Sequence, residues 1–220
     1  NFSCFIKDKF VYYSKLIISY METNFTFNRR ENEPLQHYTF ENGFSQKELD
    51  TIDIGIESMS AEKATTLGEQ SDLIRISKVK WLPQDHRWEW VYDKLADMIN
   101  EANDALWSFD LINMPEAIQF TEYHANEKGH YNWHQDIGTG TASCRKVSVT
   151  VQLSSPEDYE GGDLQITQGG PPDLAQTAPK QAGSVTIFPS YMLHRVTPVT
   201  KGVINQYYKN YAIKRHNRYF

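Results

Sequence analysis

The pattern of hydrophobic and polar residues changes its period along the chain. Between Gln84 and Trp107 apolar side chains recur every three or four positions, at Trp88, Val91, Tyr92, Leu95, Met98, Ile99, Ala102 and Leu106. This spacing predicts a helix with one buried face. Pro83 stands just before it, where a proline is tolerated. The aromatic-rich stripe is typical of core packing against a sheet.

Two shorter elements are predicted before this helix. Ser45 and Glu48 have the spacing of a capping box, in which each residue satisfies a free amide at the start of a helix. A helical stripe follows at Leu49, Ile52 and Ile56. Residues 57–71 are polar and small, which predicts a loop. Residues 73–82 alternate as a strand does, with one face made by Ile74, Ile76 and, at its end, Lys78.

From residue 117 onward strands dominate the prediction. Short apolar runs separated by turn residues indicate strands at 117–124, 129–134, 146–153, 163–167, 183–188 and 193–196. Helices first and short strands after predict an α+β, mainly β fold, a double-stranded β-helix (jelly roll) with helices packed on one sheet.

The strand at residues 146–153 has two unlike faces. One face is apolar and consists of Val147, Val149, Val151 and Leu153. The other carries Ser148, Thr150 and Gln152. Because side chains alternate across a strand, the polar set shares one side of the sheet. We predict that it lines a pocket, and the alternative is a solvated face.

Composition narrows the class of protein. A chain of 220 residues suits one domain with a sizeable core. The net charge of −6 argues against a generic nucleic-acid binder, which would carry a basic face. Cys4 and Cys144 are too few for a disulfide framework, and no apolar run approaches the ~20 residues of a membrane span. We therefore expect a cytoplasmic protein without nucleic-acid or membrane partners, of unknown oligomeric state.

The candidate chemistry lies in the segment Tyr131-Asn-Trp-His134-Gln-Asp136 and in a second histidine, His194. Residues i and i+2 of a strand point to the same side, so His134 and Asp136 can reach one metal ion. Two histidines and one carboxylate are the facial triad that holds non-haem Fe(II) with open coordination positions. An isolated H-x-D is a weak signal, and His86, His124, His130 and His216 have no comparable context.

Taken together, these motifs resemble a known family. The matching parts are Tyr123, the H-x-D, the Glu160-Gly-Gly-Asp-Leu164 segment and the run from Phe188 to Gly202 (FPSYMLHRVTPVTKG). The chain is similar to the Fe(II)- and 2-oxoglutarate-dependent dioxygenases, in their prolyl-4-hydroxylase-like (PKHD-type) branch. The likeness runs from roughly Gln36 to Val203. It implies a jelly-roll fold and an Fe(II) bound by His134, Asp136 and His194.

The resemblance also implies an activity. Such an enzyme consumes 2-oxoglutarate and O2, releases succinate and CO2, and hydroxylates a C–H bond. The nearest members of the family point to a prolyl residue of a peptide or protein, while small-molecule substrates stay open. Ascorbate is an accessory cofactor that the resemblance suggests. Two alternatives are a non-catalytic jelly-roll binding protein and, less well supported by the motifs, a cupin-like metalloenzyme.

The expected contacts to 2-oxoglutarate include one departure from the family. Tyr123 stands about ten residues before the H-x-D, where related enzymes place a tyrosine that bonds the co-substrate, and Gln152 belongs to the polar strand face. The family's basic anchor comes nine or ten positions after the second histidine, where this chain has Val203 and Ile204. Three cations could replace that anchor: Lys201, Arg195 and Arg145. Of these, we assign Lys201 to the predicted 2-oxoglutarate site.

The two ends differ in composition from the rest. Residues 1–20 do not begin with Met and mix aromatics with lysines, so one hypothesis is that the natural protein starts at Met21. The alternative is a genuine N-terminal extension. Residues 204–220 lack the apolar alternation of a last barrel strand. We therefore expect a dioxygenase domain over 21–203, followed by a divergent tail that lacks part of the final strand.

Overall fold

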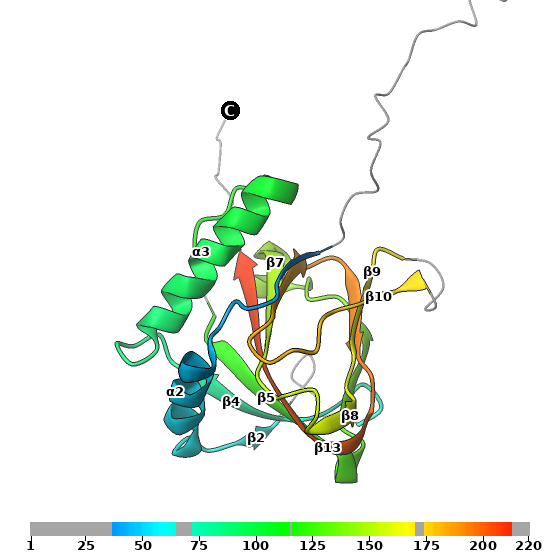
Figure 1. Cartoon of the computed structure of the whole chain (residues 1–220). Coiled ribbons are helices and arrows are strands. Elements are labelled where there is room, and N and C mark those ends of the chain that lie inside the picture. The colour runs from blue at the N-terminus through cyan, green and yellow to red at the C-terminus, as the bar shows by residue number, and fades with distance from the viewer. Residues whose placement is uncertain (1–36, 65–71, 115, 170–173, 213–220) are drawn as a thin grey trace, which may run out of the picture. The chain divides into compact units, whose positions relative to one another are not determined.

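The computed structural model describes residues 37–64, 72–114, 116–169 and 174–212, with the side chains of 207–212 excepted (Figure 1). Antiparallel strands dominate it, as the jelly-roll prediction requires. Within the described ranges, neither helix combines the length and the apolarity that crossing a membrane demands.

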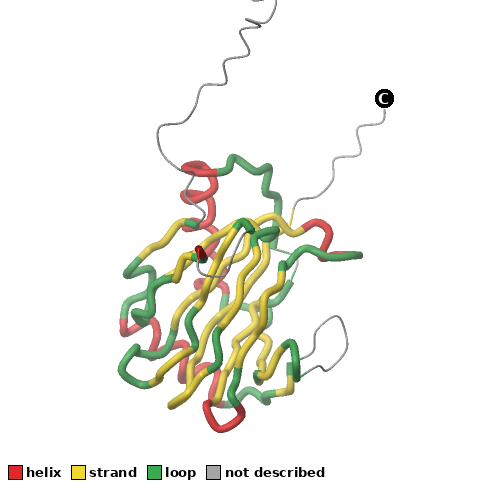
Figure 2. The backbone as a smooth tube through the Cα atoms, turned by 90° about the vertical axis from the view of Figure 1, so that its right-hand side faces the viewer, coloured by secondary structure: helices red, strands yellow, loops and turns green. Residues whose placement is uncertain are grey.

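The strands form two sheets. The larger has the order β1 (Tyr38–Phe40), β11 (Val185–Pro189), β7 (Arg145–Gln152), β13 (Val199–Ala212), β5 (Ile118–His124), β4 (Lys78–Leu82) and β2 (Glu62–Lys63), with β8 (Tyr159–Gly161) paired to β13. The smaller has the order β10 (Gln176–Thr177), β9 (Leu164–Thr167), β12 (Leu193–Val196), β6 (His130–His134) and β3 (Arg75–Ile76). Figure 2 shows the strands running side by side, joined by loops and turns. All six strands predicted after residue 116 are present, each within two residues of its predicted ends.

Two helices pack on the larger sheet (Figure 1). Helix α2 (Gln46–Glu57) begins with the predicted capping box, in which Glu48 Oε2 accepts the Ser45 N–H at 2.7 Å. Its stripe is buried as predicted. Helix α3 (Glu89–Leu106) starts five residues later than predicted. There the Asp85 carboxylate accepts the Arg87 N–H at 3.0 Å and forms a local turn that competes with a helix.

Strand β7 separates the helical core from the interior between the sheets. Its apolar face joins the helices in one hydrophobic cluster, which contains Val147, Val149 and Val151 beside Leu95 and Ile99. Ser148, Thr150 and Gln152 are also buried, but on the opposite face. The prediction of two unlike faces is confirmed, and the polar face is buried instead of solvated.

The prediction of one strand over 73–82 is wrong. The chain crosses from the smaller sheet to the larger one at Ser77, so β3 and β4 belong to different sheets. The predicted face with Ile74 and Ile76 is the more exposed one, and the buried alternation falls on Arg75, Ser77 and Val79. The hydrophobic pattern indicated the wrong face because one of the buried residues, Arg75, is charged. Residues 57–64, predicted as loop, include the short strand β2.

The expectation that the final strand is lost after Val203 is also wrong. Strand β13 continues to Ala212 and pairs with both β5 and β7, for example Ile204 with Tyr123 and Gln206 with Gln152. Backbone pairing does not require apolar alternation, and the Gln206 side chain is buried beside the polar face of β7. Residues 1–20 and 213–220 lie outside the described ranges, so the hypotheses on the two ends stay hypotheses.

Candidate metal centre

The three predicted metal ligands meet between neighbouring strands of the smaller sheet. His134 ends β6, His194 lies in β12, and the two are directly opposite in the antiparallel register. Asp136 follows two residues after His134. One ligand atom from each residue lies within 4.8 Å of the others, which is close enough to hold a single metal ion.

Backbone carbonyls orient the two imidazole rings. Nδ1 of His134 lies 2.7 Å from the Asn132 oxygen, and Nδ1 of His194 lies 3.0 Å from the Met192 oxygen. Each Nδ1 therefore carries the proton and donates it, so the lone pair of each ring is on Nε2. Both Nε2 atoms face the Asp136 carboxylate, at 3.7 Å from His134 and 3.5 Å from His194.

The Asp136 carboxylate is held from several sides. Ser148 Oγ donates to Asp136 Oδ2 at 2.5 Å, and the Asp136 N–H donates to the Ser190 carbonyl at 2.9 Å. Arg145 donates to the Asp136 carbonyl at 2.9 Å. Its guanidinium is in turn bound by both carboxylate oxygens of Glu116, at 3.0 and 2.6 Å. This scaffold fixes the carboxylate opposite the two histidines.

The electrostatics of the three groups favour a cation. Burial raises the pKa of Asp136, although His194, Ser148 and Arg145 oppose that shift. Burial, reinforced by His194, lowers the pKa of His134 well below its usual value. His134 Nε2 is buried and has no hydrogen-bond partner among the described residues. Two imidazoles and one carboxylate, with the His134 nitrogen unsatisfied, fit ferrous iron.

A narrow cavity adjoins the histidines. It is lined by Arg75, Gln119, Thr121, Tyr123, Tyr131, His134, Thr150, Leu164, His194, Val196 and Gln206. Tyr123 is therefore placed where its predicted contact with a co-substrate requires, and that role stays a prediction. Arg75 was missed, because its burial depends on the crossing at Ser77.

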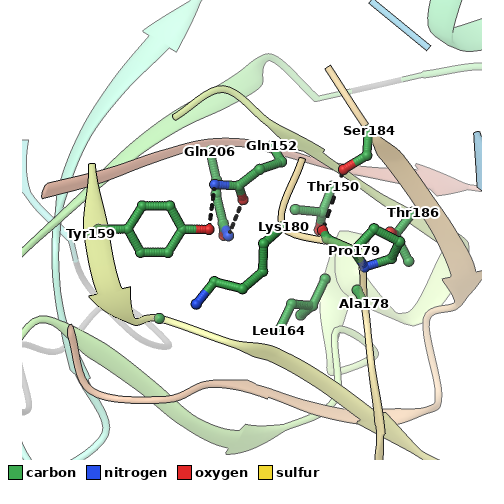
Figure 3. A pocket seen from close by; sticks show the side chains of 11 residues that line it. Thr150, Gln152, Tyr159, Leu164, Ala178, Pro179, Lys180, Ser184, Thr186 and Gln206 are labelled. Carbon is green, nitrogen blue, oxygen red and sulfur yellow. Dashed lines mark hydrogen bonds between the residues drawn. The ribbon is translucent and has the colours of Figure 1, made fainter. Parts of the chain in front are cut away.

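Gln152 lines a neighbouring cavity, which Figure 3 shows with Lys180, Tyr159 and Gln206 around it. Its amide oxygen accepts from Gln206 Nε2 at 2.8 Å, and its amide nitrogen donates to the Tyr159 hydroxyl at 3.1 Å. These bonds occupy the side chain, so the structure does not support Gln152 as a direct ligand of a co-substrate beside the histidines.

The three cations considered as substitutes for the family's arginine lie elsewhere. Lys201 is at the surface, 71% exposed in its side chain, and pairs with Glu160 at 3.1 Å. A lysine held at the surface does not reach the cavity, so its assignment to the site needs correction. Arg195 donates to Gln165 and lies 4.7 Å over the Trp133 ring, and Arg145 is bound to Glu116.

The remaining predicted features have structural roles. Gly161 has φ +76°, and a side chain there would meet the Pro198 carbonyl at 2.2 Å, as expected of a tight glycine turn. The Asp163 carboxylate binds Lys180 at 3.0 Å.

His124 pairs with Glu122, and His130 contacts the Lys128 carbonyl. In the part of the chain that the structure describes, the three residues at the metal centre form the one cluster able to hold a metal.

Comparisons with known proteins agree with this site. The family model of the 2OG-Fe(II) oxygenase superfamily matches residues 118–213. A PKHD-type hydroxylase of Nitrosomonas eutropha is 31% identical over 176 residues, which cover 74% of this chain and 73% of that protein. Another, from Teredinibacter turnerae, is 47% identical over 96 residues, or 40% and 41% of the two chains. For several such relatives the match spans less than half of their length, for example 44% for that of Nitrosomonas europaea.

Solved structures share the fold. A prolyl hydroxylase from Trichoplax adhaerens, in complex with a peptide fragment of hypoxia inducible factor, has a TM-score of 0.66 at 14% identity and covers 95% of this chain and 93% of its own. A prolyl-4-hydroxylase from Pseudomonas putida has a TM-score of 0.61 at 14% identity, with 81% and 93% covered. At these identities the likeness is one of fold.

Proposed function

Because the chain belongs to the PKHD-type hydroxylases of the 2OG-Fe(II) oxygenase superfamily, we propose that it hydroxylates a C–H bond of a prolyl residue in a peptide or protein. The observation that carries the proposal is the cluster of His134, Asp136 and His194, with both Nε2 atoms turned toward the carboxylate. A peptide substrate is supported by the prolyl hydroxylase of similar fold that was solved with a peptide.

The proposed roles follow from the geometry. His134, Asp136 and His194 would hold Fe(II), which together with 2-oxoglutarate and O2 supplies the oxidising power of this superfamily. One oxygen atom of O2 enters the hydroxylated product and the other enters succinate, with loss of CO2. The protein contributes the fixed ligand set, through Ser148 and Arg145 on Asp136, and a narrow cavity beside the two histidines.

The experiment is succinate release coupled to mass spectrometry of proline-containing peptides. Fe(II)-loaded protein with 2-oxoglutarate, O2 and ascorbate should add one oxygen to a prolyl residue. His134→Ala should abolish both products, because one of three metal ligands is lost. His130→Ala is a matched control four residues away on the same strand and should leave turnover unchanged. Full turnover by the His134→Ala variant would contradict the proposed metal centre.

A second candidate function has one observation in its favour. Ile204 occupies a position where the resemblance expects a basic residue, and it is fully buried among Tyr123, Tyr159, Val196 and Val199. A chain unable to anchor 2-oxoglutarate would be a non-catalytic binding protein that keeps its metal. Metal binding without 2-oxoglutarate binding would identify that case.

A further inference from the structure

We propose that Arg75 is the cation that binds the distal carboxylate of 2-oxoglutarate in this chain, in place of a basic residue on β13. This inference rests on the proposed function. The co-substrate is a dicarboxylate that chelates the metal through one end, so its other carboxylate needs a buried cation and hydrogen-bond donors. Strand β13 offers Ile204 instead. The cation must then come from a different element.

Arg75 lies in the wall of the cavity that adjoins the metal centre. It belongs to β3, pairs in register with Tyr131 of β6, and is 7% exposed. It lines the same cavity as His134 and His194. Its Nε donates to Ser77 Oγ at 2.7 Å, and its Nη2 donates to Gln119 Oε1 at 2.7 Å and lies 3.4 Å from Thr121 Oγ1. These bonds fix the plane of the guanidinium.

The charge of Arg75 has no direct counter-ion. Its hydrogen-bond partners are neutral, and no carboxylate in the described ranges lies within 4.0 Å of it. Taking a cation out of water without an anion is costly, so the fold retains a positive charge that an anionic ligand would neutralise. A planar guanidinium suits a carboxylate better than an ammonium does, because two parallel hydrogen bonds can form.

Neighbouring hydroxyls supply further donors. Thr150 Oγ1 is buried, lines the same cavity and has no hydrogen-bond partner among the described residues. Thr121 and Tyr123 line the cavity as well. Burial raises the pKa of Tyr123, and the positive charge of Arg75 opposes that shift. A carboxylate at Arg75 could accept from the Thr150 and Tyr123 hydroxyls, whereas the Thr121 hydroxyl already donates to Gln119 Oε1 at 3.2 Å.

Lys180 is the competing cation. It belongs to the neighbouring cavity, where Figure 3 shows its side chain extending toward Tyr159, and its Nζ lies 4.6 Å from the centre of that ring. Its ammonium is bound by the Asp163 carboxylate at 3.0 Å and by the Gly161 carbonyl at 2.8 Å. The charge of Lys180 is therefore already paired, whereas that of Arg75 has no carboxylate partner in the part of the chain that the structure describes.

Binding also requires one movement. The cavity measures about 20 Å³, which is room for a water molecule and not for a five-carbon diacid. The Tyr131 ring stacks on His134 with 3.4 Å between centroids, and Arg75 lies 4.7 Å over that ring. Tyr131 therefore has to turn away from His134 when the co-substrate enters, which opens a path from the metal to Arg75.

The test is calorimetry of ligand binding to Mn(II)-loaded protein, which needs no turnover. The ligands are 2-oxoglutarate and 2-oxobutanoate, which keeps the chelating end but lacks the distal carboxylate. Wild type should prefer 2-oxoglutarate by on the order of 10- to 100-fold, the strength expected of a charge-assisted bidentate contact. Arg75→Met should lose that preference and bind Mn(II) as before. Arg75→Lys should recover part of it.

Two matched variants make the outcome decisive. Arg195→Met removes the same side chain outside the cavity and should keep the preference, whereas Lys180→Met tests the competitor. Loss of the preference in Lys180→Met but not in Arg75→Met overturns the proposal, as does a wild type with equal affinity for both keto acids. If Arg75→Met fails to fold, the wild-type preference and the Arg75→Lys variant still decide. Failure of wild type to bind Mn(II) would instead contradict the metal centre itself.

Discussion

At the scale of single residues, Ser148 shows how a neutral side chain controls a metal ligand. Its hydroxyl donates to Asp136 Oδ2 at 2.5 Å and also contacts Ser190 Oγ at 2.9 Å, and Ser148 is fully buried. The hydrogen bond fixes which way the carboxylate faces before a metal arrives. Groups of this kind, which orient a ligand without touching the metal, typically contribute about 10- to 100-fold to metal affinity.

Ser148→Ala should therefore weaken Mn(II) binding by roughly 10-fold, because the Asp136 carboxylate loses one of its fixed donors. Calorimetry or the electron paramagnetic resonance signal of free Mn(II) measures the change. Ser184→Ala is the matched control, since Ser184 is equally buried but donates to the Pro179 and Gln181 carbonyls. Equal metal affinity in wild type and Ser148→Ala would show that Ser148 does not position the carboxylate.

The residues of the site differ in how far the sequence could reveal them. His134 and Asp136 follow from the two-residue period of a strand, and His194 from its accompanying motif. Arg75 could not be predicted, because in the sequence it interrupts an apolar alternation and reads as an exposed position. Its burial depends on a long-range fact, the change of sheet at Ser77. Lys201 was wrongly assigned to the site, because closeness in sequence to His194 does not set the direction in which its side chain points.

At the scale of elements, local signals were the reliable ones. The capping box of α2 and the two faces of β7 depend on neighbours in sequence, and both are present as predicted. Strand β13 depends on partners far away, on β5 and β7, and its polar residues concealed it. The late start of α3 had a visible cause in Asp85, whose side chain bonds the Arg87 amide.

Glu48 connects α2 to α3 and makes the stability of the helical layer depend on pH. Burial tends to raise its pKa, but hydrogen bonds from Lys94 and from the Ser45 amide and hydroxyl outweigh burial and lower the pKa from 4.5 to about 2. A carboxylate with a depressed pKa in the folded state stabilises above its unfolded pKa, and that contribution disappears as the pH falls from about 4.5 to about 2.

Glu48→Gln should accordingly lower the free energy of unfolding by about 1 kcal/mol at pH 7, the size of a typical capping contribution. The difference from wild type should shrink below pH 4.5, because Glu48 of the unfolded wild-type chain then takes up a proton, while the folded carboxylate stays ionised until about pH 2. Urea unfolding at pH 7 and pH 3 measures both values. Glu57→Gln, at the other end of α2, is the control. A difference that stays constant with pH would contradict the ionised capping interaction.

At the scale of the whole molecule, the two sheets enclose a polar interior that is costly without a ligand. Asp136 is a buried carboxylate beside two imidazoles, and Arg75 is a buried cation that contacts no carboxylate among the residues that the structure describes. Both costs fall when a divalent metal neutralises the carboxylate and an anion neutralises the guanidinium. The same groups that destabilise the empty fold therefore give it affinity for a metal and a dicarboxylate, and ligand binding should be visible as stability.

Mn(II) at 100 times its dissociation constant should stabilise the folded state by about 2.7 kcal/mol, and the melting temperature of a chain of this size should then rise by roughly 5–10 °C. His134→Ala should show no such rise, and a chelator should reverse it in wild type. The rise should decrease as the pH is lowered from 7.5 to 4.5, because protons compete with the metal for Asp136, whose pKa burial raises, and at the acid end for the His134 nitrogen, whose pKa burial lowers. In the metal-free protein His134 has a pKa well below 6.5, so acid destabilises this fold where the unfolded chain takes up a proton and the folded one does not. Differential scanning fluorimetry across this pH range, with and without Mn(II), separates the two effects. A metal-induced rise that persists unchanged at pH 4.5 would mean that the ion binds through groups other than Asp136 and His134.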